Sequence, residues 1–447
     1  MATFQTVAMD QRGRWHTFAR ATSDQRMRTF LIIALVATMP VNVIFGDKQT
    51  ATNIAASDIF MPLGILFLGW SLAKGRLLLP VISLCLLSLS SIVASIFFNL
   101  GTYFRNGETA RVPIEVAKIA WLWLLFYLFV NLIRNRSDLR LVVKVWVLGS
   151  VAEALCGIGG SLAYQIGNID NPFSEMFRAQ GTLGDSNLFA AHLAAGFFLA
   201  LLYRKLSRTA SQWVFYAMGI QLVGIYFSAS RGGLLSILVS LLFLWLFATS
   251  GKQKVAVGLA LLLGGGAVLA LSTTDENGLL ASNPMTERLK TSTVSLNDPE
   301  AQQRARLWRV ALDGFFDSPF FGIGRGNYAS LEADDPNGAG HAHNTVLGLL
   351  CETGLVGLGS YLAFGSAVLF GLVRDWMATR FREQRNTDGI LLTALLVVGL
   401  SGVTINIENY RGLWILLGVV VAYCRLHIGQ VDKREGVRSV PVRRALA

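Results

Sequence analysis

The chain has 447 residues, of which 53% are hydrophobic and only 15% are charged. Soluble proteins carry about 25% charged residues, so this composition excludes an ordinary soluble enzyme and is typical of a membrane protein. The net charge of +11 lies mostly in segments that membrane topology requires to be basic, and we therefore expect no nucleic-acid partner.

Apolar runs long enough to cross a membrane, about 20 residues each, recur along the whole chain. They predict an all-α integral membrane protein with about 12 transmembrane helices; the first and eleventh runs are short, which leaves the count open by one or two. In chain order the runs are 30–46, 54–73, 77–99, 115–133, 141–164, 187–203, 212–228, 233–249, 255–272, 343–373, 389–405 and 412–427.

Basic residues fill both tails and alternate short loops, and these segments hold 25 of the 39 Lys and Arg residues. Because positive charge stays on the cytoplasmic side of a membrane, both termini are expected to be cytoplasmic. The predicted organisation is a basic cytoplasmic tail (1–29), transmembrane helices 1–9 (30–272), one large loop on the far side of the membrane (273–342), transmembrane helices 10–12 (343–427) and a second basic cytoplasmic tail (428–447).

The large far-side loop is expected to be partly helical. Pro299 and Glu300 are typical of a first helical turn, and the apolar residues that follow recur at helical spacing, which predicts an amphipathic helix. Its apolar face, expected to lie on the membrane or to cover the spans, consists of Trp308, Ala311, Leu312 and Phe315. The glycine-rich segment 319–328 follows, and its glycines could let backbone N–H groups approach an anion.

Arginines on the far side oppose the topology rule and need another reason to be there. Arg178 and Arg231 lie in short loops between spans, where a guanidinium has few ways to be solvated. The large loop adds Arg304, Arg306, Arg309 and Arg325. Guanidinium groups suit bidentate capture of phosphate oxygens, so several that converge on one pocket would hold a diphosphate. The alternative, favoured for the arginines of the predicted loop helix, is helix capping, contact with lipid phosphates or pairing with acidic residues.

His341 and His343 close the large loop, at the mouth of the tenth predicted span. Histidine titrates near neutral pH, so this pair suggests proton transfer on a substrate that the membrane delivers. His343 is the favoured base and His341 the reserve; the alternative for His343 is to cap the tenth span together with Asn344. The four cysteines lie far apart without metal-ligand spacing.

Three segments resemble the O-antigen ligase and polymerase superfamily of bacterial envelope glycosyltransferases. They are Arg178–Ala190 (RAQGT…NLFA), Ser228–Gly233 (SASRGG) and His343–Gly357 (HNTVL…ETGLVG). The segment 305–328 looks like the long periplasmic loop of that family. The resemblance implies a GT-C-like membrane glycosyltransferase of the bacterial inner membrane, with its active site on the periplasmic side.

Members of this superfamily act on sugars carried by undecaprenyl diphosphate. One large loop before the last three spans is more similar to an O-antigen ligase, which transfers the O-antigen to lipid A–core in lipopolysaccharide biosynthesis. The alternatives are an O-antigen polymerase, a protein O-oligosaccharyltransferase of the same superfamily and, from a different class, a polyprenyl-diphosphate-sugar flippase or transporter.

The expected reaction is an inverting displacement without a metal or other cofactor, since no Asp-x-Asp motif lies on the far side. Charge stabilisation of the departing diphosphate would come from Arg178 and Arg231, helped by Arg325 or by an arginine of the loop helix such as Arg304 or Arg309. His343, or His341, would deprotonate the acceptor hydroxyl. The expected partners are the undecaprenyl-diphosphate-linked O-antigen, the lipid A–core oligosaccharide and membrane lipids.

Overall fold

The computed structural model describes residues 6–9, 15–18, 22–45, 52–106, 109, 111–207, 212–247, 299–332, 340–379 and 381–434, and a few isolated helical residues between 251 and 266. Its helices are α1 (Ser23–Thr38), α2 (Met61–Ala73), α3 (Ile82–Phe98), α4 (Leu100–Arg105), α5 (Arg111–Leu132), α6 (Arg136–Gly167), α7 (Ser186–Leu206), α8 (Trp213–Phe227), α9 (Arg231–Phe247), α12 (Pro299–Asp317), α13 (Thr345–Ala378), α14 (Arg382–Ser401) and α15 (Arg411–Arg434), with short 3-10 helices η1 (Ala56–Phe60) and η2 (Asn327–Glu332).

Strands are confined to three two-stranded antiparallel hairpins in this part of the chain. They pair β1 (Thr6–Met9) with β2 (Trp15–Phe18), β3 (Asn42–Phe45) with β4 (Thr52–Ala55), and β5 (Ser174–Glu175) with β6 (Arg178–Ala179). The protein is therefore an all-α membrane protein in class, as the hydropathy pattern predicts.

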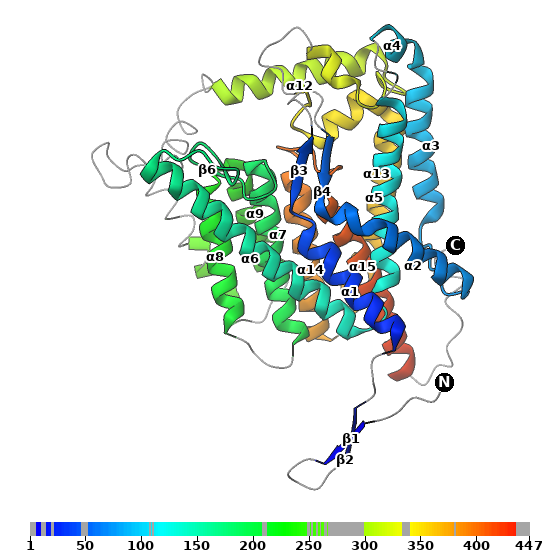
Figure 1. Cartoon of the computed structure of the whole chain (residues 1–447), viewed down its shortest axis with the longest axis vertical. Helices are drawn as coiled ribbons and strands as arrows, with labels where there is room; N and C mark the ends of the chain where they lie inside the picture. Colours follow the sequence, from blue (N-terminus) through cyan, green and yellow to red (C-terminus); the bar gives the residue numbers. More distant parts are fainter. Residues whose placement is uncertain are drawn as a thin grey trace.

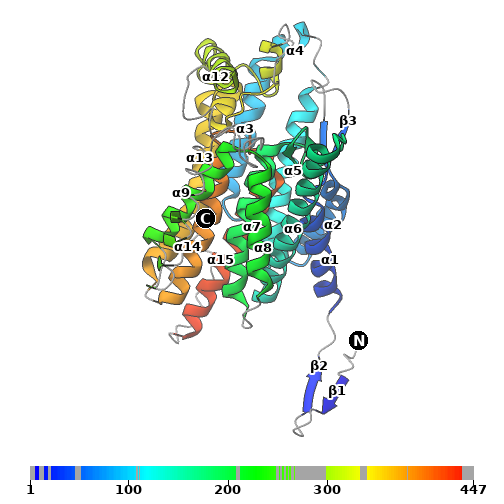
Figure 2. The ribbon, with the colours of Figure 1, turned by 90° about the vertical axis from the view of Figure 1, so that its left-hand side faces the viewer.

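The long helices pack side by side, with α12 lying across one end of them (Figures 1 and 2). We call this end the loop end, and the opposite end, where α1 begins and α15 ends, the tail end. One large core of buried apolar side chains joins α1, α5, α6, α7, α14 and α15. A small second cluster, which includes Ala311, Tyr328 and Cys351, fastens α12 and the loop after it to α13.

Five described helices are long and apolar enough to cross a membrane: Ala56–Ala73, Val112–Leu132, Arg136–Gly167, Ser186–Leu206 and Thr345–Ala378. Three shorter apolar helices accompany them, at Ile82–Phe98, Trp213–Phe227 and Arg231–Phe247. A multi-pass membrane protein follows from these helices. The count of twelve spans stays a prediction, and the predicted run 255–272 lies mostly outside the described residues.

The first span differs from the predicted run 30–46. Helix α1 begins at Ser23, because the side chain of Thr22 caps it by accepting a hydrogen bond from the Gln25 N–H at 3.3 Å. It ends at Thr38, shortly before Pro40, which cannot supply a backbone N–H to a helix. The β-branched residues beyond that proline form strand β3 instead.

The tenth predicted span, 343–373, is broken near its start. Gly354 has φ 64° and ψ −166°, so α13 consists of a short first segment and a long second one. The segment around Phe320 fills the break: the N–H groups of Leu355 and Val356 donate to the carbonyls of Pro319 and Phe320, at 2.9 and 3.1 Å. The candidate histidines therefore precede a short helix and not the long membrane-crossing segment itself.

Replacing Gly354 by alanine should destabilise the protein by about 1–3 kcal/mol through backbone strain alone. An added Cβ would also lie 2.4 Å from the Phe320 backbone. Gly359→Ala, on the same helix, is the matched control, because a Cβ there meets nothing within 4 Å and alanine is the better helix former. The midpoint of thermal unfolding in detergent should fall for the first variant only. An unchanged midpoint for Gly354→Ala contradicts the broken helix.

Helix α12 forms where the loop sequence predicts an amphipathic helix, but its buried face is rotated from the predicted one. Leu307 and Ala311 are each 1% exposed, whereas Leu312 is 36% exposed. The rotation follows from Gly314, where a Cβ would lie 2.8 Å from the Cys351 sulfur. The missing side chain lets α12 approach α13 along the line Leu307–Ala311–Gly314.

Candidate functional site

A cavity of about 640 Å³ lies towards the loop end of the described structure, and both candidate histidines line it. One wall is a single face of α5, with residues at helical spacing: Ile114, Ala117, Lys118, Trp121 and Leu122. The other walls come from the end of α1 and strand β3, η1, the start of α7, and the loop between α14 and α15. The cavity therefore collects segments from both halves of the chain.

The two histidines stand side by side, with ring centroids 4.1 Å apart. His343 has φ 47°, a left-handed conformation that is uncommon for a residue other than glycine. Such strained residues cluster at active sites. The neighbouring residue, Asn344, caps helix α13: its side chain accepts the Leu347 N–H at 3.0 Å. Capping therefore accounts for Asn344 and leaves the His343 ring at the cavity.

The surroundings of His343 lower its pKa to about 4. Burial is the main cause, the neighbouring His341 and Arg304 act in the same direction, and Asp185 opposes them. The imidazole is therefore neutral at pH 7 and can accept a proton. Arg304, half-buried on α12, is close enough to His343 to contribute to this electrostatic balance.

Arg178 lies in a polar cluster that unites two of the three motif segments. Its Nε donates to the Ser228 carbonyl at 3.3 Å, and its Nη2 donates to the Asn187 side-chain oxygen at 3.4 Å. The same oxygen accepts the hydroxyl of Ser230 at 2.8 Å. Arg231 follows directly as the first residue of α9. The turn before α9 and the hairpin β5–β6 therefore meet at Asn187.

The start of α7 connects this arginine cluster to the cavity. Asp185 lines the cavity, and its side chain caps α7 by accepting the N–H groups of Asn187 and Leu188 at 2.8 and 2.7 Å. On the other side, Gly232 lies against Thr404, where an added Cβ would be 2.7 Å from the threonine hydroxyl. The two sites are thus neighbours that share helix α7.

Glu153 of α6 holds the loop that carries the first motif. It is 5% exposed and accepts both the N–H and the hydroxyl of Thr182, at 2.8 and 2.5 Å. Gly181 adopts φ 57° directly before Thr182, and a Cβ there would lie 2.3 Å from the Glu153 carboxylate. A carboxylate within a membrane span is energetically unfavourable. Glu153, which lies in the predicted fifth span, therefore serves to position the loop that contains Thr182.

Arg325 is placed differently from Arg178 and Arg231. It is 3% exposed, and three glutamates from separate elements surround it: Glu352 at 2.8 Å, Glu408 at 3.4 Å and Glu115 at 3.7 Å. Burial opposes its charge, but these carboxylates outweigh burial and raise its pKa. Arg325 is not among the residues that line the cavity.

The glycine-rich segment around Arg325 uses its backbone N–H groups within the protein. The Gly322 N–H donates to Ser318, and the Gly324 N–H donates to Glu352, at 2.8 and 3.1 Å. The idea that these two amides face an anion is therefore wrong, because both donate to backbone carbonyls of the protein itself. On α12, Arg306 pairs with Glu332 at 3.1 Å, and Arg309 is exposed.

Two cavity cations, Arg411 and Lys118, do not figure among the residues that the sequence singles out. Arg411 grips both oxygens of Asp58, with its Nε 2.9 Å from Oδ1, and Trp121 donates to the same Oδ1 at 2.9 Å. Lys118 pairs with Glu115 at 2.7 Å. Arg411 has the same sequence feature as Arg178, since it is an arginine in a short loop between two predicted spans, and that loop is expected on the far side of the membrane.

Comparison with known proteins links this region to one family. Residues 216–362 match the family model described as O-antigen ligase. The matched segment contains Arg231, helix α12, Arg325 and both candidate histidines. No curated protein matches the chain.

Proposed function

We propose that this chain, whose residues 216–362 match the O-antigen ligase family model, transfers O-antigen polysaccharide from undecaprenyl diphosphate to a sugar hydroxyl of lipid A–core. The observation that carries this proposal is the junction at α7. There, a cavity lined by His341 and His343 adjoins a cluster that contains Arg178 and Arg231.

On the donor side, Arg178 and Arg231 hold the diphosphate, with Arg304 of α12 as the third cation. Guanidinium forks match phosphate oxygens, and the start of α9, where Arg231 lies, adds the positive end of a helix dipole. These groups stabilise the charge that develops as the diphosphate leaves. Arg309 is exposed on α12 and is not proposed to contact the diphosphate. Arg325 is surrounded by Glu115, Glu352 and Glu408 and serves as an anchor for the loop.

His343 is the general base. Its lowered pKa keeps it unprotonated at neutral pH, and the negative charge of a bound diphosphate raises its basicity in the complex. The base removes the proton from the acceptor hydroxyl, whose oxygen attacks the anomeric carbon. The bond from that carbon to the diphosphate breaks, and direct displacement inverts the anomeric centre. We expect the residues of this chain to suffice without a cofactor.

On the acceptor side, the composition of the cavity suits a sugar. Ligand pockets combine apolar and aromatic side chains with a few polar groups that fix orientation. Besides the histidines and the charged side chains, the cavity offers three amides and two aromatic rings: Asn42, Asn406, Asn409, Trp121 and Tyr410. The loop end is then periplasmic and the tail end cytoplasmic, in the bacterial inner membrane, because Arg28, Arg134 and Arg425 gather at the tail end.

The test is a reconstitution with purified protein, lipid-linked O-antigen and lipid A–core in the same detergent micelles. A ligase joins the O-antigen to the core, which a gel-mobility shift of the core detects. Chain extension on the carrier alone would instead identify a polymerase. A flippase or transporter would make no product, because it moves a lipid-linked sugar across a membrane and forms no glycosidic bond. Either of the last two results overturns the proposal.

The pH dependence of kcat/KM should report the base of the free enzyme. Because the pKa of His343 is lowered to about 4, activity should stay level from pH 8 down to about 5 and fall only near pH 4. If the base instead had an ordinary histidine pKa of about 6.5, the enzyme would already have lost half of its activity at about pH 6.5. His341→Gln removes one cause of the lowering, so its acid limb should move to higher pH. A limb near pH 6.5 in the unaltered protein contradicts this assignment.

A further inference from the structure

A second, smaller pocket lies at the tail end, remote from the histidines. Its volume is about 330 Å³, and its lining is Arg76, Leu78, Asn131, Arg134 and Arg425. The three arginines come from the loop after α2, the turn between α5 and α6, and helix α15. Three guanidinium groups from separate segments thus surround one small space.

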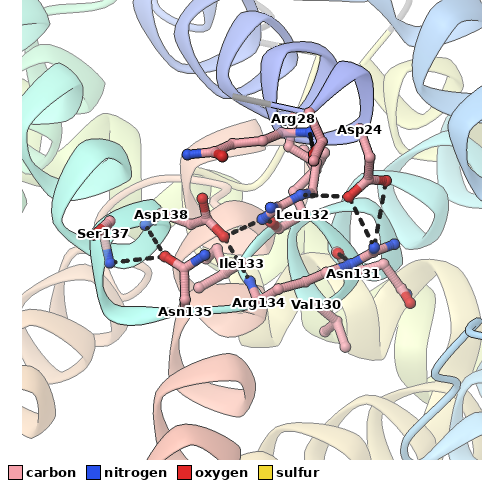
Figure 3. A network of polar contacts seen from close by, with 12 residues as sticks. Asp24, Arg28, Val130, Asn131, Leu132, Ile133, Arg134, Asn135, Ser137 and Asp138 are labelled. Atoms are coloured by element: carbon pink, nitrogen blue, oxygen red, sulfur yellow. Dashed lines mark hydrogen bonds and ion pairs between the residues drawn. The ribbon is translucent and has the colours of Figure 1, made fainter. Parts of the chain in front are cut away.

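The carboxylates nearby are already shared between other arginines. Arg28, 6% exposed, pairs with Asp138 and, through its Nε at 3.2 Å, with Asp24. Arg134 contacts both oxygens of Asp24, at 3.3 and 3.1 Å, and its backbone N–H donates to Asp138 at 3.0 Å. Figure 3 shows this network: Asp24 lies between the guanidinium groups of Arg28 and Arg134, and Asp138 accepts from Arg28 and from the backbone N–H of Arg134.

Arg425 and Arg76 have no such partner in the part of the chain that the structure describes. Arg425 donates to the backbone carbonyls of Val130, at 3.2 Å, and Ile133, which are neutral acceptors at the end of α5. Arg76 is exposed, and no ion pair of its side chain occurs among the described residues. Four arginines therefore face two carboxylates here, and the pocket keeps an excess of two positive charges.

The pocket is also rigid. Asn131, 2% exposed, binds both backbone groups of Leu78: its side-chain oxygen accepts the N–H and its amide donates to the carbonyl, each at 2.9 Å. Arg134 is further held by Ser71, at 3.3 Å. The loop that carries Arg76 is thereby fixed against α5, so a ligand meets a preformed site.

The surface beside the pocket is apolar. Leu78 is 41% exposed, Leu79 is 44% exposed and Leu72 of α2 is 64% exposed. A phosphate with an excess of guanidinium groups around it and alkyl surface next to it matches the headgroup and chains of an anionic lipid. A soluble phosphate would use the cations but not the apolar rim.

We propose that this pocket of Arg76, Arg134 and Arg425 binds the phosphate headgroup of an anionic membrane lipid. The bound lipid would join α2, α5 and α15 at the tail end, on the side opposite the glycosyl-transfer site. The site is independent of that reaction, since none of its residues lines the histidine cavity.

Thermal unfolding of the full-length protein in neutral detergent tests the proposal. Phosphatidylglycerol should raise the unfolding midpoint in a saturable way, whereas phosphatidylcholine and inorganic phosphate at the same concentration should not. Arg76→Gln should weaken the phosphatidylglycerol effect at least tenfold in concentration. Because Arg76 is exposed and bonds nothing through its side chain in the described structure, the variant should fold normally. Arg425→Gln, which also removes a cap of α5, is the second variant.

Arg204→Gln is the matched control, because Arg204 lies near the end of α7, stacked over Phe215 at 4.4 Å, and outside the pocket. It should keep the full response to phosphatidylglycerol. An equal response to phosphatidylcholine, or an undiminished response in Arg76→Gln, overturns the site. An equal response to inorganic phosphate overturns the assignment to a lipid. Lipid binding is read without donor or acceptor, so its failure leaves the proposed reaction untouched.

Discussion

Replacing His343 by asparagine should lower the rate of glycosyl transfer by roughly 100-fold to 10,000-fold, the usual contribution of a positioned general base. Asparagine is the informative substitution because it tolerates the left-handed backbone better than most residues, and His343 has φ 47°. The loss of rate is then a loss of the imidazole and not of the local fold. Turnover in micelles and the midpoint of thermal unfolding are the two measurements.

His341→Asn is the control for this experiment. The two rings lie 4.1 Å apart in the same cavity, so any general effect of removing a histidine on the cavity acts on both variants. The proposal expects His341→Asn to keep most of the turnover. A larger loss in His341→Asn than in His343→Asn would exchange the two roles, and near-normal turnover in His343→Asn would eliminate it as the base.

The second large effect is expected for Arg231→Lys. Lysine keeps the charge but loses the planar fork, and hydrogen bonds to charged groups are worth about 1.5–3 kcal/mol, which corresponds to a rate loss of roughly 10-fold to 100-fold. Arg178→Lys should behave alike. If both side chains grip one diphosphate, the double variant loses less than the sum of the single losses, because the two positions are coupled.

Arg309→Lys serves as the control for the arginines. Arg309 is exposed on α12 and takes no part in the cluster around Asn187, so its variant should keep full turnover. Measured kcat and KM separate the two ways in which Arg231 acts. A fall in kcat indicates stabilisation of the departing diphosphate, and a rise in KM alone indicates binding of the donor in its ground state. Full activity in Arg231→Lys would assign Arg231 to packing instead.

Arg325 and Arg411 illustrate why the sequence cannot sort arginines by role. Both lie on the same side of the predicted membrane, and each meets a carboxylate that is remote in the chain: Arg325 meets Glu115, and Arg411 meets Asp58. A guanidinium whose charge is met by buried carboxylates inside the protein acts as an anchor. Only the folded chain reveals which partners come within reach.

The sequence by itself determined the features that depend on local composition. Apolar runs predict helices because a backbone in lipid must satisfy its own hydrogen bonds. Each predicted run overlaps a described helix, except 255–272, which lies mostly outside the described residues. The motif arginines and the histidine pair can also be identified from the sequence alone, since arginine is suited to binding phosphate and histidine to accepting a proton.

What only the tertiary structure decided are the features that depend on contacts between distant segments. The break at Gly354 exists because the Pro319–Phe320 backbone fills it, and the buried face of α12 follows from close packing at Gly314. The junction at α7 likewise requires Asn187 to meet the turn at Ser230. Hydropathy reports the preference of each segment for lipid, but a site is made of distances between segments, and folding sets those distances.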